Sequence, residues 1–125
     1  MARVLIIDDD PAILALVSGI LEAQGHSVIV THDGQEGVKA FTNERFDLVV
    51  TDIVMPEQEG ITTIGAIRRL NRTVPILAMS GSHTVGRYGG HLDAAAIVGA
   101  NATLAKPLEP QTLIGTVDRL LQTHL

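Results

Sequence analysis

The chain has 125 residues, of which 46% are hydrophobic and 18% are charged. That length fits one folding unit, and the hydrophobic share is large enough to bury a core, which excludes a disordered chain. Lysine and arginine number 9 against 14 aspartates and glutamates, for a net charge of −5, and no segment clusters basic residues with interleaved aromatics. We therefore expect no direct binding to nucleic acid. The lack of cysteine excludes disulfides, thiolate-bound zinc and a cysteine nucleophile.

No stretch of the sequence is long and apolar enough to span a membrane. The longest apolar runs, such as residues 4–7, are far shorter than the roughly 18 residues of a membrane helix. The first expected strand also begins too early for a signal peptide. We therefore expect a cytoplasmic chain that makes no membrane contact and forms one domain over residues 1–125.

The first expected elements are a buried strand and a helix. Residues 4–7 form an apolar run that predicts a strand buried on both faces, and three aspartates end it. Asp10 then predicts a helix N-cap, Pro11 fits the first helical turn, and Gly25 closes the helix. The apolar side chains that recur at helical spacing in this segment are Ile13, Leu14, Leu16, Val17, Ile20 and Leu21.

The alternation of strand and helix then continues. Residues 28–30 predict a second strand, and a turn at Asp33-Gly34 separates it from a short helix around Val38. Residues 48–50 predict a third strand, which ends at Asp52. A third helix follows, with one apolar stripe made of Ile61, Ile64, Ile67 and Leu70.

Two further strands complete the pattern. Residues 75–79 predict a fourth strand, which delivers Ser80 at its end. Residues 82–90 are rich in glycine and predict a loop, which leads into a helix near residues 92–98. Residues 102–105 predict a fifth strand, which leads to Lys106-Pro107. The last helix has an apolar face made of Leu113, Ile114, Val117, Leu120 and Leu121.

The segment after the fifth strand is short. Roughly 18 residues follow Pro107, which is enough for one helix of about 27 Å. We therefore expect no output domain in this chain.

Five apolar strands that alternate with five helices predict an α/β fold with an open parallel sheet and right-handed crossovers. The fold class that we expect is flavodoxin-like, a doubly wound five-stranded sheet with strand order 2-1-3-4-5 and helices on both faces. In such a sheet, ligands bind outside the carboxyl ends of the strands, where the strand order reverses.

The carboxyl ends of these strands carry an unusual set of polar residues. Asp8 and Asp9 follow the first strand and Asp52 ends the third, and these strands are neighbours about 5 Å apart in the expected order. Two like charges 4 Å apart repel by roughly 4 kcal/mol at an effective dielectric near 20, so the cluster needs protons or a cation. Because the only donors are oxygens, the site suits Mg²⁺ together with a phosphate oxygen.

Two more residues at this edge suit phosphoryl chemistry. Lys106 would neutralise negative charge on a phosphoryl group, and the Ser80 hydroxyl could donate a hydrogen bond to one of its oxygens. Asp52 would then be the nucleophile. Histidines 26, 32, 83, 91 and 124 show no metal-ligand spacing.

These residues together resemble the receiver domain of two-component response regulators, over essentially the whole chain. Each motif is weak alone, but their order along the chain is specific. The motifs that carry the resemblance are residues 4–11 with Asp8-Asp9, residues 47–52 running into Met55-Pro56, residues 78–81 with Ser80, and Gly99-Ala100 ahead of Lys106-Pro107.

The resemblance implies a role for each site residue. Asp8 and Asp9 would hold Mg²⁺ with the backbone carbonyl of Val54, and Asp52 would be a further ligand and accept a phosphoryl group from a histidine kinase or phosphotransfer protein. Ser80 and Lys106 would sense that group. The resemblance also implies a cis peptide bond between Lys106 and its proline. It implies as well that such a domain catalyses its own phosphorylation and slow dephosphorylation, and is a switch more than a metabolic enzyme.

The same resemblance suggests how a signal leaves the domain. A downstream protein would read a surface formed by the fourth helix, the fifth strand and the last helix, with a homodimer as a further possibility. Family members usually carry Tyr or Phe three residues before the lysine, where this chain has Thr103. Because Thr103 lacks the bulk to fill the space that Ser80 would vacate, we hypothesise a muted output switch.

Three other functions compete with this one. A haloacid-dehalogenase-type phosphatase would use Asp8 as nucleophile, but Ala12 stands where its motif prefers Thr or Val, and no insertion could form a cap. Residues 81–88 have the glycine spacing of a P-loop, but Arg87 and Tyr88 replace its lysine and hydroxyl residue. A receiver-like interaction module that acts without phosphorylation stays the main alternative, although the complete set of site residues argues against it.

Overall fold

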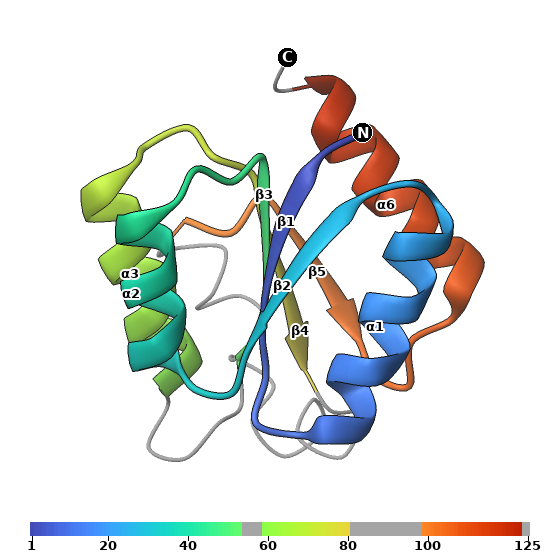
Figure 1. The fold of residues 1–125 in the computed structure, drawn as a ribbon, viewed down its shortest axis with the longest axis horizontal. Helices are drawn as coiled ribbons and strands as arrows, with labels where there is room; N and C mark the ends of the chain where they lie inside the picture. Colours follow the sequence, from blue (N-terminus) through green and yellow to red (C-terminus); the bar gives the residue numbers. More distant parts are fainter. Residues whose placement is uncertain (54–58, 81–98, 124–125) are drawn as a thin grey trace.

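The computed structural model describes residues 1–53, 59–80 and 99–123. It confirms the flavodoxin-like fold, a five-stranded sheet in the order β2-β1-β3-β4-β5 in which every neighbouring pair is parallel (Figure 1). The strands are β1 (Arg3–Ile7), β2 (Ser27–Thr31), β3 (Leu48–Asp52), β4 (Ile76–Ser80) and β5 (Ala102–Ala105). The helices are α1 (Pro11–Ala23), α2 (Gly34–Asn43), α3 (Glu59–Leu70) and α6 (Pro110–Thr123).

The sequence predicts all five strands to within two residues at each end. The helix expected near residues 92–98 and the glycine-rich loop before it lie outside the described residues. Within the described ranges, no helix has the length and hydrophobicity of a membrane span.

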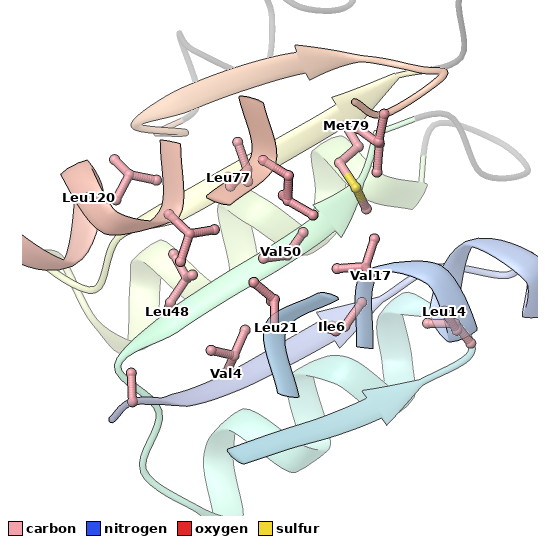
Figure 2. Packing of buried hydrophobic residues seen from close by; sticks show 14 residues of the cluster. Val4, Ile6, Leu14, Val17, Leu21, Leu48, Val50, Leu77, Met79 and Leu120 are labelled. Atoms are coloured by element: carbon pink, nitrogen blue, oxygen red, sulfur yellow. The ribbon is translucent and has the colours of Figure 1, made fainter. Parts of the chain in front are cut away.

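Helices cover both faces of the sheet, as expected. Figure 1 shows α1 and α6 on one face and α2 and α3 on the other. Successive residues of a strand point to opposite faces, so each central strand supplies side chains to two separate cores. On the α1 and α6 side, Figure 2 shows a layer of side chains that includes Val4, Ile6, Leu14, Val17, Leu21, Leu48, Val50, Leu77, Met79 and Leu120.

The second core lies between the sheet and helices α2 and α3. It takes the alternate strand residues together with the α3 stripe, and its buried members are Leu5, Ile7, Phe46, Val49, Ile53, Ile64, Ile67, Val74, Ile76 and Ala78. Because β1, β3 and β4 are buried on both faces, their continuous apolar runs contribute side chains to both cores. This double burial fixes the positions at which the three strands end.

Three apolar side chains of the predicted strands and helices are exposed. Val30 is 39% exposed because β2 is an edge strand. Leu16 is 42% exposed because it lies on the side of α1 away from Leu14 and Val17. Leu70 is 53% exposed because it is the last residue of α3. The predicted apolar faces of the helices at Leu16 and Leu70 are therefore wider than the faces that are buried.

Acidic side chains begin three of the helices. Asp10 caps α1 as predicted, with its carboxylate accepting a 2.9 Å hydrogen bond from the Ala12 amide. Asp33, expected in a turn, caps α2 in the same way. Before α6, the Glu109 carboxylate accepts hydrogen bonds from the backbone amide and the hydroxyl of Thr112, and these bonds hold the pKa of Glu109 below its ordinary value.

Gly37 of α2 tests how tightly this helix packs on the sheet. An added Cβ would lie 2.4 Å from Cδ1 and 2.7 Å from Cγ1 of Ile7, which is fully buried in β1. We therefore expect Gly37→Ala to lower the free energy of unfolding by about 1–3 kcal/mol in urea denaturation. The control Gly19→Ala, in α1 with open space around it, should raise that free energy by about 0.5–1 kcal/mol. Equal effects of the two substitutions would contradict the packing argument.

Candidate functional site

The carboxyl edge of the sheet brings three carboxylates together. Ile7 pairs with Thr51 in the register of β1 and β3, so the residues that follow them, Asp8 and Asp52, lie side by side. One ligand oxygen from each of Asp8, Asp9 and Asp52 lies within 4.8 Å of the others. The clustering predicted from the sequence is confirmed.

The three carboxylates differ in their exposure to water. Asp8 is fully buried and Asp52 is 3% exposed, whereas Asp9 is exposed. The backbone holds Asp8 from two sides, because its amide donates to the Thr31 carbonyl at 3.2 Å and the Asp10 amide donates to Asp8 Oδ1 at 2.9 Å. Asp8 is therefore a fixed and buried group, and Asp9 is the exposed member of the cluster.

Lys106 joins the cluster from the far edge of the sheet. Its Nζ lies 2.9 Å from Asp8 Oδ2 and 3.5 Å from Asp52 Oδ2, and its side chain is only 16% exposed. The Lys106 amide donates to the Ser80 carbonyl at 2.6 Å, which continues the ladder between β4 and β5 up to the site. The peptide bond between Lys106 and Pro107 is cis, as the sequence resemblance implies.

The remaining predicted residues lie around this cluster. Ser80 is fully buried at the end of β4, directly after Met79, which pairs with Asp52. Thr103 lies in β5 opposite Ala78 and is partly buried. Val54 lies outside the described residues, so the role of its carbonyl stays a prediction.

The electrostatics of the site favour a cation. Burial raises the pKa of Asp8 above its ordinary value, and the Asp9 charge adds a smaller increase, while the Asp10 amide and Lys106 oppose both. Three carboxylates face one ammonium group, which leaves two negative charges when all are ionised. A divalent cation would balance them, and an all-oxygen donor set fits Mg²⁺.

Two supporting contacts were not foreseen from the sequence. The Thr31 hydroxyl donates to the Ile6 carbonyl at 3.2 Å, and the Thr31 carbonyl accepts the Asp8 amide, so the end of β2 orients Asp8. The Asp10 amide has the same effect, although the sequence predicts only a cap there. In the sequence, only the position of Thr31 at the end of a predicted strand could have indicated these contacts. Among the described residues, no histidine belongs to a metal-ligand cluster.

Comparison with known proteins agrees with this geometry. The family model of the response regulator receiver domain matches residues 4–118. The chain is 30% identical over 122 residues to the transcriptional regulatory protein CpxR of Escherichia coli, covering 98% of this chain and 50% of CpxR. It is 33% identical over 120 residues to the transcriptional regulatory protein PrrA of Mycobacterium tuberculosis, covering 96% of this chain and 50% of PrrA. The chain thus spans about half the length of these curated relatives.

Solved structures give the same result. A CheY-like receiver domain protein from Methanospirillum hungatei superposes with a TM-score of 0.89 at 28% identity, covering 99% of this chain and 96% of that one. The chemotaxis protein CheY4 of Vibrio cholerae superposes with a TM-score of 0.84 at 32% identity, covering 96% and 98%. The chain belongs to the response regulator receiver domain family of two-component systems.

The buried Asp8 carboxyl makes stability depend on pH in a defined direction. Below the ordinary pKa of 3.8, Asp8 is protonated in both folded and unfolded chains. As the pH rises through the raised folded pKa, the folded state loses stability, because ionising the buried group costs more than ionising it in the unfolded chain. In urea denaturation with EDTA, we expect Asp8→Asn to gain stability relative to the wild type from about pH 4 to pH 7.

Adding Mg²⁺ should reverse this order. The wild type at pH 7 should gain about 2.7 kcal/mol at a concentration of one hundred times Kd, and Asp8→Asn should gain little. Asp10→Asn is the matched control, since it removes a neighbouring charge but keeps a residue that caps helices well. Identical pH profiles for the wild type and Asp8→Asn would contradict the raised pKa, and an equal response to Mg²⁺ would contradict the cation site.

Proposed function

We propose that this receiver domain is a phosphorylation switch in which Asp52 accepts a phosphoryl group from a histidine kinase or phosphotransfer protein. The observation that carries the proposal is the convergence of three carboxylates and the Lys106 ammonium at one edge of the sheet. Membership in the receiver domain family supports it.

Asp8 is poorly placed to act as the nucleophile. Both oxygens of Asp8 already accept hydrogen bonds, Oδ1 from the Asp10 amide and Oδ2 from Lys106. Asp8 is also sealed from solvent, whereas Asp52 keeps a small exposed area. An oxygen of Asp52 would form its bond to phosphorus while the bond to the donor's histidine nitrogen breaks. This argues against the phosphatase alternative, which needs Asp8 as nucleophile.

The other groups have supporting roles. Asp8, Asp9 and Asp52 would hold Mg²⁺, together with the carbonyl predicted at Val54. When bound, the metal ion would offset negative charge on the phosphoryl oxygens. The Lys106 ammonium, 3.5 Å from Asp52 Oδ2, is close enough to neutralise charge on the attached group.

Ser80 is the hydroxyl at the neighbouring strand end, and it would donate a hydrogen bond to a phosphoryl oxygen. The added charge would thereby pull on the ends of β4 and β5, which share the bond from the Lys106 amide to the Ser80 carbonyl. A downstream protein would read the change on a surface that includes β5 and α6. A cytoplasmic location, and dimerisation through the same surface, belong to this proposal.

Phosphorylation can be measured by intact mass after incubation with acetyl phosphate and Mg²⁺. We expect one phosphoryl adduct on the wild type, no adduct on Asp52→Asn, and none when EDTA removes the metal. Peptide mapping should assign the adduct to Asp52.

Two further variants make this experiment decisive. Asp10→Asn, at the same edge but outside the carboxylate cluster, should be phosphorylated like the wild type. An adduct that persists in Asp52→Asn and vanishes in Asp8→Asn would favour the phosphatase chemistry. A wild type that stays unmodified would favour the module that acts without phosphorylation.

Thr103 sets the expected extent of the conformational response. It is smaller than the aromatic residue usual at this position of the family, so it fills less space beside β4. We expect backbone amide shifts on addition of a phosphoryl mimic to be small and confined to the neighbourhood of Asp8, Asp52 and Lys106. Large shifts spread across residues 88–106 in the NMR spectrum would contradict a muted switch.

A further inference from the structure

A groove lies at the end of the sheet opposite the carboxylates. It has a volume of about 560 Å³, and residues 41–47, 70, 71 and 73–75 line it, so that Arg72 stands beside the lining without belonging to it. These segments are the end of α2 with its connection to β3, and the end of α3 with its connection to β4. They approach the sheet at the upper left of Figure 1, far from the arrowheads of the strands. The phosphorylation site does not use this groove.

The groove has an apolar lining that is open to solvent. Leu70 is 53% exposed, the largest exposed fraction of any large apolar side chain in the described part of the chain except Met1. Phe41 is partly buried and stacks on Phe46 with ring centroids 6.3 Å apart. Val74 and Pro75 are buried behind them. An apolar side chain of another molecule could therefore pack against the exposed Leu70 and the partly buried Phe41.

The acidic side chains of the groove already have partners. Glu44 pairs with the guanidinium of Arg3, and the Asp47 carboxylate accepts a 2.8 Å hydrogen bond from the Arg3 amide. The Arg3 guanidinium also lies 5.4 Å from the centre of the Phe46 ring. Arg3 thus offsets much of the negative charge at this end.

The arginines nearby lack such partners. Arg45, Arg69 and Arg72 are exposed, and none of them forms an ion pair with another residue of the described ranges. With Arg3 and Arg68, five of the seven arginines of a chain with net charge −5 lie in or next to the groove segments. The groove and the residues beside it therefore carry positive charge that no carboxylate of the described ranges pairs at Arg45, Arg69 and Arg72.

Hydrogen bonds hold the segment that follows α3 in one conformation. Arg68 donates to the carbonyls of Asn71 and Val74 at 3.2 and 2.6 Å, and Asn71 Oδ1 accepts from the amides of Thr73 and Val74 at 2.8 Å each. At the end of α2, the Ala40 carbonyl accepts from the Glu44 amide at 3.0 Å, whereas the carbonyls of residues 41–43 lie beyond the reach of an intrahelical bond. They could accept hydrogen bonds from the backbone amides of an extended peptide.

We propose that this groove binds an extended acidic segment of a partner protein, with one apolar side chain seated against Leu70 and Phe41 and carboxylates near Arg45 and Arg72. The charge complementarity argues for an acidic occupant, and the exposed apolar lining argues for a peptide over a bare phosphate. The binding does not depend on the state of Asp52, so it stands or falls separately from the phosphorylation switch.

Selection from a library of random dodecapeptides displayed on phage tests this directly, using the full chain without phosphoryl donor. We expect enriched peptides to combine several aspartates or glutamates with one large apolar residue. Titration of an enriched peptide should shift backbone amides of residues 41–47 and 70–75 and leave those around Asp8 and Asp52 unmoved. Arg45→Gln with Arg72→Gln should weaken binding roughly five- to tenfold.

Matched variants make the outcome decisive. Lys39→Gln removes an exposed charge from α2 outside the groove lining and should leave the affinity unchanged. Leu70→Gln should weaken binding without changing its salt dependence. The proposal is overturned if no peptide is enriched, if enriched peptides carry no acidic bias, or if shifts map elsewhere. It is also overturned if inorganic phosphate reproduces the shifts, or if the chain dimerises through these residues in place of binding peptide.

Discussion

The ion pair between the Lys106 ammonium and the Asp8 carboxylate is the interaction on which the site depends. The two residues are 98 positions apart in the sequence and directly follow β1 and β5, between which β3 and β4 lie in the sheet. A fully buried carboxylate without a partner would be costly, and a pair whose second member is lost leaves an unpaired buried charge. The ion pair therefore stabilises the Asp8 carboxylate in the folded chain. It also holds the Lys106 ammonium beside Asp52.

The rest of the carboxyl edge is arranged around that pair by backbone hydrogen bonds. The amide of Asp10 and the carbonyl of Thr31 fix Asp8, while the carbonyl of Ser80 fixes the start of the segment that carries Lys106. The bonds to the carbonyls of Thr31 and Ser80 continue the strand ladders, so the residues that carry the site are positioned by the sheet itself. A site built in this way keeps its charges close together although they repel, because the double-sided core sets where each strand ends.

Much of this organisation could be predicted from the sequence, and the reasons are local. Short apolar runs predict strands that are buried on both faces, and an aspartate at the end of such a strand lies at the carboxyl edge of the sheet. The exposure of Val30 is not contained in its apolar run, and it follows only from the predicted strand order, which places the second strand at the sheet edge. The supporting bonds at Thr31 depend on the register between strands, which local patterns do not fix. The groove around Leu70 arises where two helices end together, and no single segment contains that information.

The separation of charge along the strands has a consequence for how the domain meets other molecules. A strand of five residues is about 16 Å long, whereas electrostatic screening acts over about 8 Å at physiological ionic strength. The carboxylate edge and the arginine end are therefore felt independently by anything that approaches either of them. A net charge of −5 describes neither surface. Two oppositely charged macromolecules could therefore bind this small domain at the same time, one at the carboxylate edge and one at the arginine end.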